Sequence, residues 1–377
     1  MWRIALRSLL FHRGKTAAAL CGIAFASMLL FVQAGVYVGF LDAAAGLITH
    51  IGGDIWVMRR GTQAIDVAHT MPPEVRTVVM SQPCVLSARP VFVTYMPFRS
   101  VSGQSGSILL VGMHISERQS GPGLVPWSVL QGLPRDLRGP RRFTLDESIL
   151  GRLHIPLHSA LGLELEIAGR SARLVAITRG VRSFSTAPIA FMELSELQEI
   201  EGTPDGTARF WVLELEHPAC AAEVIRRIGS MPMLQAMTTA DFRQTAESYW
   251  IGGTGAGALL AFSSVLGFVV GALIVAQTLF NLTQDHLRQL GTLKALGALS
   301  REIVLFVAWQ ALALAGVGAG VGAALATAVS SASTVLAITL SPSVWLMGVS
   351  AVGLMCTLAC ASSIHKVLTL EPAEVFR

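Results

Sequence analysis

The sequence predicts a membrane protein with four transmembrane α-helices and a large α+β extracytoplasmic domain between the first and second spans. Only 14% of its 377 residues are charged, against about 25% in a soluble globular domain. Stretches of 26, 37 and 62 residues contain no Asp, Glu, Lys or Arg: 16–41, 248–284 and 303–364. A span needs roughly 20 apolar residues, so the third stretch holds two spans, with a turn near 330–343.

The orientation follows from the positive charges that flank the spans. Arg3, Arg7, Arg13 and Lys15 precede the first span without any acidic residue, which predicts a cytoplasmic N-terminus. Four spans return the C-terminus to the cytoplasm, so both termini of this multi-pass membrane protein are expected there. The first apolar run exceeds the 7–15 residues of a signal-peptide core, so we interpret it as an uncleaved signal anchor.

These boundaries divide the chain into eight parts. They are a cytoplasmic N-terminus (1–15), the first span (16–41), the external α+β domain (42–247, with an inserted subdomain at about 120–185), a stalk and second span (248–282), a cytoplasmic segment (283–302), the third span (303–330), the fourth span (342–364) and a cytoplasmic C-terminus (365–377).

Within the external domain, alternating apolar residues and turn signals predict the elements in order. "DIWVM" is a strand, "PPEVRTVVMS" a short helix, and two β-rich runs separated by "RSVSGQSG" form a hairpin. A Gly-, Pro- and Arg-rich stretch at 120–142 is expected to be irregular and exposed. A strand, a short helix, two strands, a strand and a helix follow, and then a strand, a helix and a strand. The last helix, from 239, is expected to run without a break into the second span.

Cys84 and Cys220 both lie in the external domain, where an oxidising compartment would allow a disulfide. A spacing of 136 positions does not decide whether they pair. Cys21, Cys356 and Cys360 lie in spans and are interpreted as small buried apolar residues.

Several function classes are excluded or disfavoured by the residues. The "GKT" at 14–16 lacks the glycine that a phosphate-binding loop requires, because Leu9 occupies that position. The chain therefore has no nucleotide site, and Lys15 is a charge anchor. The formal charge of +4 is explained by topology rather than by a nucleic-acid partner. Histidines and acids show no metal-ligand spacing, and paired glutamates such as Glu164/Glu166 are interpreted as solvated strand faces, so no cofactor and no catalytic residue is assigned.

The spans contain no charged residue that would indicate a proton relay or an ion path. Their amides, Gln33, Gln277, Asn281 and Gln310, are of the kind that hydrogen-bonds between helices. An ion-coupled carrier is therefore disfavoured, and the energy for any transport must come from a partner.

Small residues four positions apart allow helix backbones to approach closely. The second span carries Gly267 and Gly271, and "GVGAGVG" in the third carries Gly316 and Gly320. Packing within one subunit and a dimer interface are both open interpretations.

The segment 283–302 interrupts the apolar chain with "LGTLKALGALSRE", which contains Lys294, one of three lysines. Its leucines recur at near-helical spacing. This pattern predicts an amphipathic helix or helix pair at the inner membrane surface. There are two alternatives: a plain interfacial loop, and a helix that fits a groove on a cytosolic partner.

At three places the chain resembles the four-span permeases of ABC transporters of the MacB/FtsX type. "GTLKALGA" at 291–298 matches the cytoplasmic-loop motif of that family, and the terminal "LEPAEVFR" is similar to its ending. The order of one span, an external domain and three spans agrees along the whole chain. "GGDIWVM" resembles the DevC branch. "RQL" at 288–290 departs from the usual Arg-Glu-Ile, so an ATPase contact by the family's glutamate is not carried over to Gln289.

The resemblance implies a homodimeric permease bound to a separate cytosolic ABC ATPase that holds ATP and Mg²⁺. It further implies a location in a bacterial plasma (inner) membrane, a periplasmic adaptor and an outer-membrane duct for cargo. The ATPase would contact Arg288, Gly291, Thr292, Leu293, Lys294, Ala295, Leu296 and Gly297. Two alternatives share the same plan: an FtsX-like mechanotransmitter that activates an external hydrolase, and lipid or lipoprotein extraction of the LolC/LolE type. A haem exporter is a weaker variant, because no axial-ligand pair stands out.

Overall fold

A computed structural model describes all residues except 1–8, 10, 12, 102, 116–127, 154, 182–186, 286–298, 333–337 and 369–377. It divides into two compact units. We call Met1–Gly39 together with Ala258–Arg377 the membrane unit, and Phe40–Gly257 the external domain.

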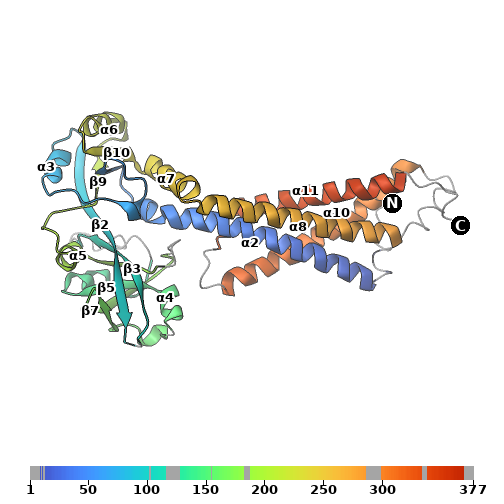
Figure 1. Ribbon diagram of the computed structural model, residues 1–377, viewed down its shortest axis with the longest axis horizontal. Helices are drawn as coiled ribbons and strands as arrows, with labels where there is room; N and C mark the ends of the chain where they lie inside the picture. The colour runs from blue at the N-terminus through green and yellow to red at the C-terminus, as the bar shows by residue number, and fades with distance from the viewer. Residues whose placement is uncertain are drawn as a thin grey trace. The chain divides into compact units, whose positions relative to one another are not determined.

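The described part of the chain contains four helices that are long and apolar enough to span a membrane. They are α2 (Arg13–Ile51), α8 (Ala256–Asp285), α10 (Ser300–Ala332) and α11 (Pro342–Leu368) (Figure 1). The four predicted spans are therefore confirmed. Proline at the first position of α11 suits a helix start, because its missing N–H would have no intrahelical partner.

The membrane unit has a core made largely of small and aliphatic side chains. Ala19, Ile23 and Ala26 of α2 meet residues of the other three helices there, among them Val275, Ala311 and Met355. The segment before α11 is tied back to α2, because the Thr339 amide donates to the Gly35 carbonyl oxygen at 3.0 Å.

The external domain mixes strands and short helices in the order that the sequence predicts. Its first elements are β1 (Ile55–Arg59), η1 (Ile65–Val67), α3 (Val75–Met80), β2 (Val85–Ser100), β3 (Ser105–Met113), β4 (Ser128–Gly132), η2 (Pro134–Arg138), β5 (Arg142–Asp146) and α4 (Glu147–Arg152). The remainder are η3 (Leu157–Ser159), β6 (Glu164–Ile167), β7 (Arg170–Arg179), β8 (Ile189–Glu193), α5 (Leu194–Glu201), β9 (Phe210–Leu215), η4 (Pro218–Cys220), α6 (Ala221–Gly229), β10 (Leu234–Thr238), α7 (Thr239–Ser248) and η5 (Tyr249–Gly253).

In the described residues, ten strands form one sheet, in the order β10-β1-β9-β2-β3-β8-β5-β7-β4, with β6 pairing β2 and β7. The predicted hairpin is confirmed as the antiparallel pair β2–β3. Two pairs, β3–β8 and β5–β7, are parallel. The α+β class is therefore confirmed.

The sheet supports two lobes, and the long strand β2 belongs to both. In the first lobe, Trp56, Phe210 and Phe242 pack together with ring centroids 5.4–5.6 Å apart, and β9 pairs the first half of β2. In the second lobe, residues between Phe92 and Leu197 form a separate core, and β3 pairs the second half of β2. Figure 1 shows α3 and α6 with the first lobe, and α4 and α5 with the second.

Local signals in the sequence explain where several helices begin and end. The Asp146 carboxylate accepts from the Ser148 amide at the start of α4, and the Thr238 hydroxyl accepts from the Asp241 amide at the start of α7. Gly202 ends α5 in the left-handed conformation.

Two expectations about this domain are wrong. The stretch 120–142 is not wholly irregular, because Ser128–Gly132 form strand β4, which pairs with the long strand β7. The last helix does not run unbroken into the second span. It passes into a π-helical turn at Tyr249–Gly253, and the chain then takes a positive φ of 76° at Gly255 before α8 begins.

Candidate functional site

The predicted ATPase-coupling residues, Arg288 and Gly291–Gly297, lie outside the described residues. The structure defines the two ends of this segment: α8 ends at Asp285 and α10 begins at Ser300. The start of α10 is capped, because the Leu299 amide donates to the Glu302 carboxylate at 3.2 Å and the Glu302 amide donates to the Leu299 carbonyl at 2.9 Å. The coupling role stays a prediction.

Gly267 and Gly271 of α8 both face other helices of the same chain. A Cβ atom at Gly267 would lie 2.7 Å from Nε2 of Gln33 in α2, and one at Gly271 would lie 2.7 Å from the Met355 methyl group in α11. Each glycine therefore allows a close approach that alanine would disturb.

The glycines of "GVGAGVG" divide between two faces of α10. Cβ atoms at Gly318 and Gly322 would lie within 2.5–2.8 Å of α2 atoms, whereas Gly316 and Gly320 have no described atom within 4 Å. Packing within one chain therefore uses Gly318 and Gly322, which the sequence did not single out. A dimer contact through Gly316 and Gly320 stays a prediction.

An apolar groove of about 410 Å³ lies between α2, α8 and α11. Its walls include Gln33, Tyr37, Ser264, Val265, Met347 and Gly348. The Gln33 Oε1 atom is buried and has no hydrogen-bond partner among the described residues, and the Ser264 hydroxyl donates to Leu260 of its own helix. The groove is thus an apolar surface with few polar groups.

The chain leaves the membrane unit through α2 without a break. The last turns of this helix bury Leu47, Ile48 and Ile51 in the first lobe of the external domain. The segment that follows is held by hydrogen bonds, because the Thr239 hydroxyl donates to the Gly53 carbonyl and Asp54 Oδ2 accepts from the Leu215 amide at 2.8 Å. The end of α2 is therefore part of the domain core.

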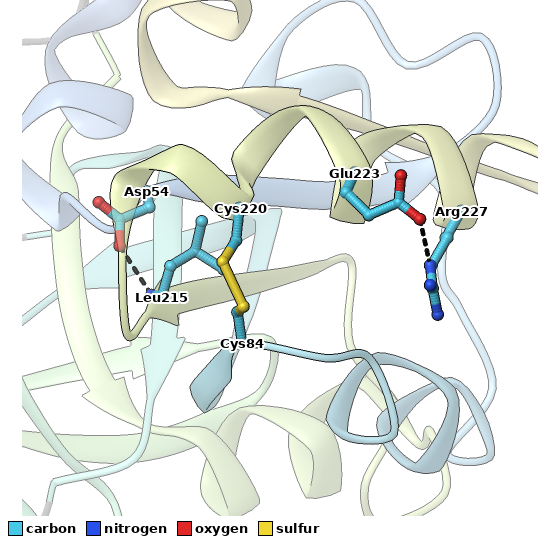
Figure 2. The surroundings of a disulfide bond; sticks show 6 residues. All are labelled: Asp54, Cys84, Leu215, Cys220, Glu223 and Arg227. Atoms are coloured by element: carbon cyan, nitrogen blue, oxygen red, sulfur yellow. Dashed lines mark hydrogen bonds and ion pairs between the residues drawn. A yellow bond between two sulfur atoms is a disulfide. The ribbon is translucent and has the colours of Figure 1, made fainter.

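Cys84 and Cys220 are joined by a disulfide bond, with their Cα atoms 6.3 Å apart. Figure 2 shows the bond between the segment before β2 and the start of α6, near the Asp54–Leu215 hydrogen bond. On α6 itself, Glu223 accepts from Arg227 at 2.6 Å. The bond ties α6 to the strand β2 that both lobes share.

The described part of the external domain shows no constellation of catalytic groups. Glu164 and Glu166 are exposed on β6, and Glu214 is paired with Arg89 at 3.1 Å. Burial raises the pKa of Asp146, but its carboxylate accepts three hydrogen bonds that fix α4 and the chain at Val181. No group of three potential metal ligands is present in these residues.

Two family descriptions match the chain. Residues 16–231 match the MacB-like periplasmic core domain, and residues 261–372 match the FtsX-like permease C-terminal domain. Because the first match alone spans more than half of the 377 residues, the chain belongs to the MacB/FtsX-type permease family. No protein with a curated description matches it.

Solved structures similar to part of this chain include two external domains of transporters. The periplasmic region of MacB from Actinobacillus actinomycetemcomitans is 14% identical over 53% of this chain and 95% of that chain, with a TM-score of 0.39. The extracellular domain of the ABC-type transporter YknZ from Gram-positive bacteria is 14% identical over 49% of this chain and 98% of that chain, with a TM-score of 0.35.

The family and the four apolar helices together define a multi-pass inner-membrane protein that is the permease component of an ABC system. Permeases of this family work with a cytosolic ABC ATPase. The predicted resemblance to the MacB/FtsX type is confirmed.

Proposed function

We propose that this chain is the permease subunit of a DevC-like exporter, in which a separate cytosolic ATPase drives movement of the external domain. A homodimer of the chain would bind two ATPase copies at residues 283–302, with both termini in the cytoplasm. A periplasmic adaptor and an outer-membrane duct would carry cargo onward. ATP and Mg²⁺ would bind only to the ATPase.

One observation carries this proposal: α2 is a single helix from Arg13 to Ile51 whose last turns are buried in the external-domain core. A movement of this helix in the membrane would therefore also displace the residues of the domain core that pack against it. The absence of charged residues from the predicted spans removes the usual means of ion coupling. The energy source is then a partner, as mechanical transmission requires.

The test is the substitution Leu293→Asp in the full chain, reconstituted in nanodiscs with the cytosolic ABC ATPase that copurifies with the parent chain. An apolar contact with the ATPase would be replaced by a buried charge. We expect the complex to assemble, ATP hydrolysis to continue, and cargo export by cells to fall at least tenfold.

Leu293→Met is the matched control, because it keeps an apolar side chain of similar volume. It should export as the parent chain does. Unchanged export by Leu293→Asp would refute the role of the segment in coupling.

The groove in the membrane unit favours a second candidate, extraction of lipids or lipoproteins from the membrane. Its apolar walls suit an acyl chain better than a polar solute. A photoreactive side chain at Phe268, a half-buried residue of the groove, should then crosslink to lipid-like material, whereas one at Leu312, an exposed residue of α10, should not do so selectively. Equal labelling at both positions would leave only the exporter.

A further inference from the structure

The external domain has two covalent connections to the membrane unit, and the structure makes them very different. The first is α2, which contains 39 residues in one helix and is therefore about 58 Å long. Its residues Ala44, Ala45, Leu47 and Ile48 are each less than 5% exposed. The helix is thus continuous at the point where it enters the domain, and it is anchored there by packing.

The second connection is the segment between α7 and α8, which we call the joint (residues 252–257). Gly252, Gly253, Thr254 and Gly255 are all exposed. A Cβ atom at Gly252 or Gly255 would meet no described atom within 4 Å, and Gly255 has a φ of 76°. Since glycine populates this region readily and costs a helix about 1 kcal/mol relative to alanine, the joint bends most easily at its exposed positions, Gly252–Gly255. Gly257 is the packed end of the joint, because it is buried and a Cβ atom there would overlap the Ile251 backbone.

The joint has a firm end within the external domain. Phe242 and Ala246 of α7 are fully buried in the first lobe, and Tyr249 and Trp250 pack against the same core with ring centroids 5.3 Å apart. Thr254 closes the turn, because its hydroxyl donates to the Trp250 carbonyl and accepts from the Ala256 amide. Packing against the core therefore extends through Trp250. The π-helical turn continues to Gly253, but no residue from Gly252 to Gly255 is buried.

We propose that α2 is the rigid element that transmits movement to the external domain, and that the joint is a hinge that lets the domain turn about it. This inference rests on the proposed function. It assigns transmission to the first span, whereas a stalk built on the second span would need a continuous helix where the joint contains four glycines. A glycine joint passes on less bending moment than a continuous helix does, and it leaves the domain free to follow α2.

Hydrogen exchange of the full chain in nanodiscs, without any ATPase, tests the mechanical contrast. Amides of 252–257 should exchange at least 100-fold faster than amides of 40–51. The triple substitution of Gly252, Gly253 and Gly255 by alanine should slow exchange at the joint at least tenfold. Protection of 252–257 in the parent chain as strong as that of α7 would overturn the hinge.

A second arm tests transmission with the ATPase present, by recording the ATP-dependent change of exchange in β1 and β9. The double substitution Asp42→Gly with Ala43→Gly softens α2 and should reduce this change at least fivefold. Asp42→Ala is the matched control, since it removes the same carboxylate from Arg243, 3.9 Å away, and keeps the helix. Gly169→Ala controls for alanine at an open position of positive φ.

The outcomes separate the two proposals. If the parent chain shows no ATP-dependent change, the proposed function fails, and transmission through α2 fails with it. If the parent responds and the softened α2 responds equally, the function stands and this inference is wrong. If the triple alanine variant strengthens the response while the softened α2 leaves it unchanged, transmission runs through the second span.

Discussion

Different kinds of contact stabilise the external domain and the membrane unit, each within itself. The external domain buries large aromatic side chains such as Trp56, Phe143 and Trp211. It adds ion pairs, among them Arg209–Glu201 at 2.7 Å, and a disulfide bond. The membrane unit instead brings helix backbones close together at glycines, as at Gly318 and Gly322.

The difference follows from the two surroundings. In water, burying an aromatic side chain removes a large apolar area from solvent, which stabilises the fold by about 25 cal/mol per Å². Lipid tails are as apolar as leucine, so helices in a bilayer gain from close packing rather than from burial. We therefore expect the external domain to be destabilised by loss of its disulfide bond or by cavities in its core. We expect the membrane unit to be destabilised by methyl groups added at its close helix contacts.

The largest expected effect is loss of the disulfide bond. Cys84→Ser should destabilise the external domain by about 2–4 kcal/mol, because the bond restricts the unfolded chain across 136 positions. Chemical unfolding of the full chain, followed by the fluorescence of its buried tryptophans, measures this. The parent chain with dithiothreitol should behave like the variant.

Cys21→Ser is the control for this prediction, because Cys21 is a free thiol on α2 and is exposed, so its expected burial is wrong. It should unfold like the parent chain. Equal stability of Cys84→Ser and the parent would mean that the external domain depends on its core alone.

A smaller effect is expected from one methyl group in the membrane unit. A Cβ atom at Gly322 would lie 2.6 Å from the Ala24 carbonyl oxygen, so Gly322→Ala must push α10 away from α2, at a cost of about 1–3 kcal/mol. Thermal unfolding in detergent should show a lower midpoint. Gly320→Ala, two residues away with open space around it, should not lower the midpoint.

This matched pair also addresses the oligomer. If Gly320→Ala or Gly316→Ala leaves the monomer stable but shifts the chain from dimer to monomer in native mass spectrometry, the outward face of α10 is the dimer contact. If both leave the dimer intact, that prediction is wrong. A lower midpoint for Gly320→Ala would contradict the division of glycines between the two faces.

The sequence predicts much of the external domain because each element carries a local signal. The alternation in "LELEI" marks β6, whose exposed and buried residues alternate, and the turn residues between β2 and β3 mark their hairpin. The long stretches without charged residues predict the four spans just as directly. These features depend on neighbours in the chain, which a sequence displays directly.

What the sequence leaves open depends on partners far along the chain. Gly316/Gly320 and Gly318/Gly322 have the same spacing, so the period cannot tell which pair faces α2. The pairing of Cys84 with Cys220 requires the meeting of β2 and α6. The break before α8 had a local signal in "IGGTGAG", which the apolar pattern around it outweighed in our prediction.

The smallest expected effect concerns a buried carboxylate of the external domain. Asp66 lies in η1, and its Oδ1 atom is buried without a hydrogen-bond partner among the described residues. Burial raises the pKa of Asp66 above its ordinary value of 3.8, although hydrogen bonds from its own backbone amide and from Tyr95 oppose this. The native state therefore binds more protons than the unfolded state between 3.8 and the raised pKa.

Stability contributed by this group is consequently present below about pH 4 and is lost as the pH rises through the raised pKa. Asp66→Asn removes the titration, so the variant should be slightly more stable than the parent at pH 7, by less than about 1 kcal/mol, and this advantage should disappear near pH 4. Urea unfolding at the two pH values measures the difference. Asp205→Asn, at an exposed position, controls for the change of residue type and should leave the stability at pH 7 unchanged. An advantage for Asp66→Asn that is equal at both pH values would mean that the amide stabilises η1 by a new hydrogen bond, and that the ionisation of Asp66 costs the fold nothing.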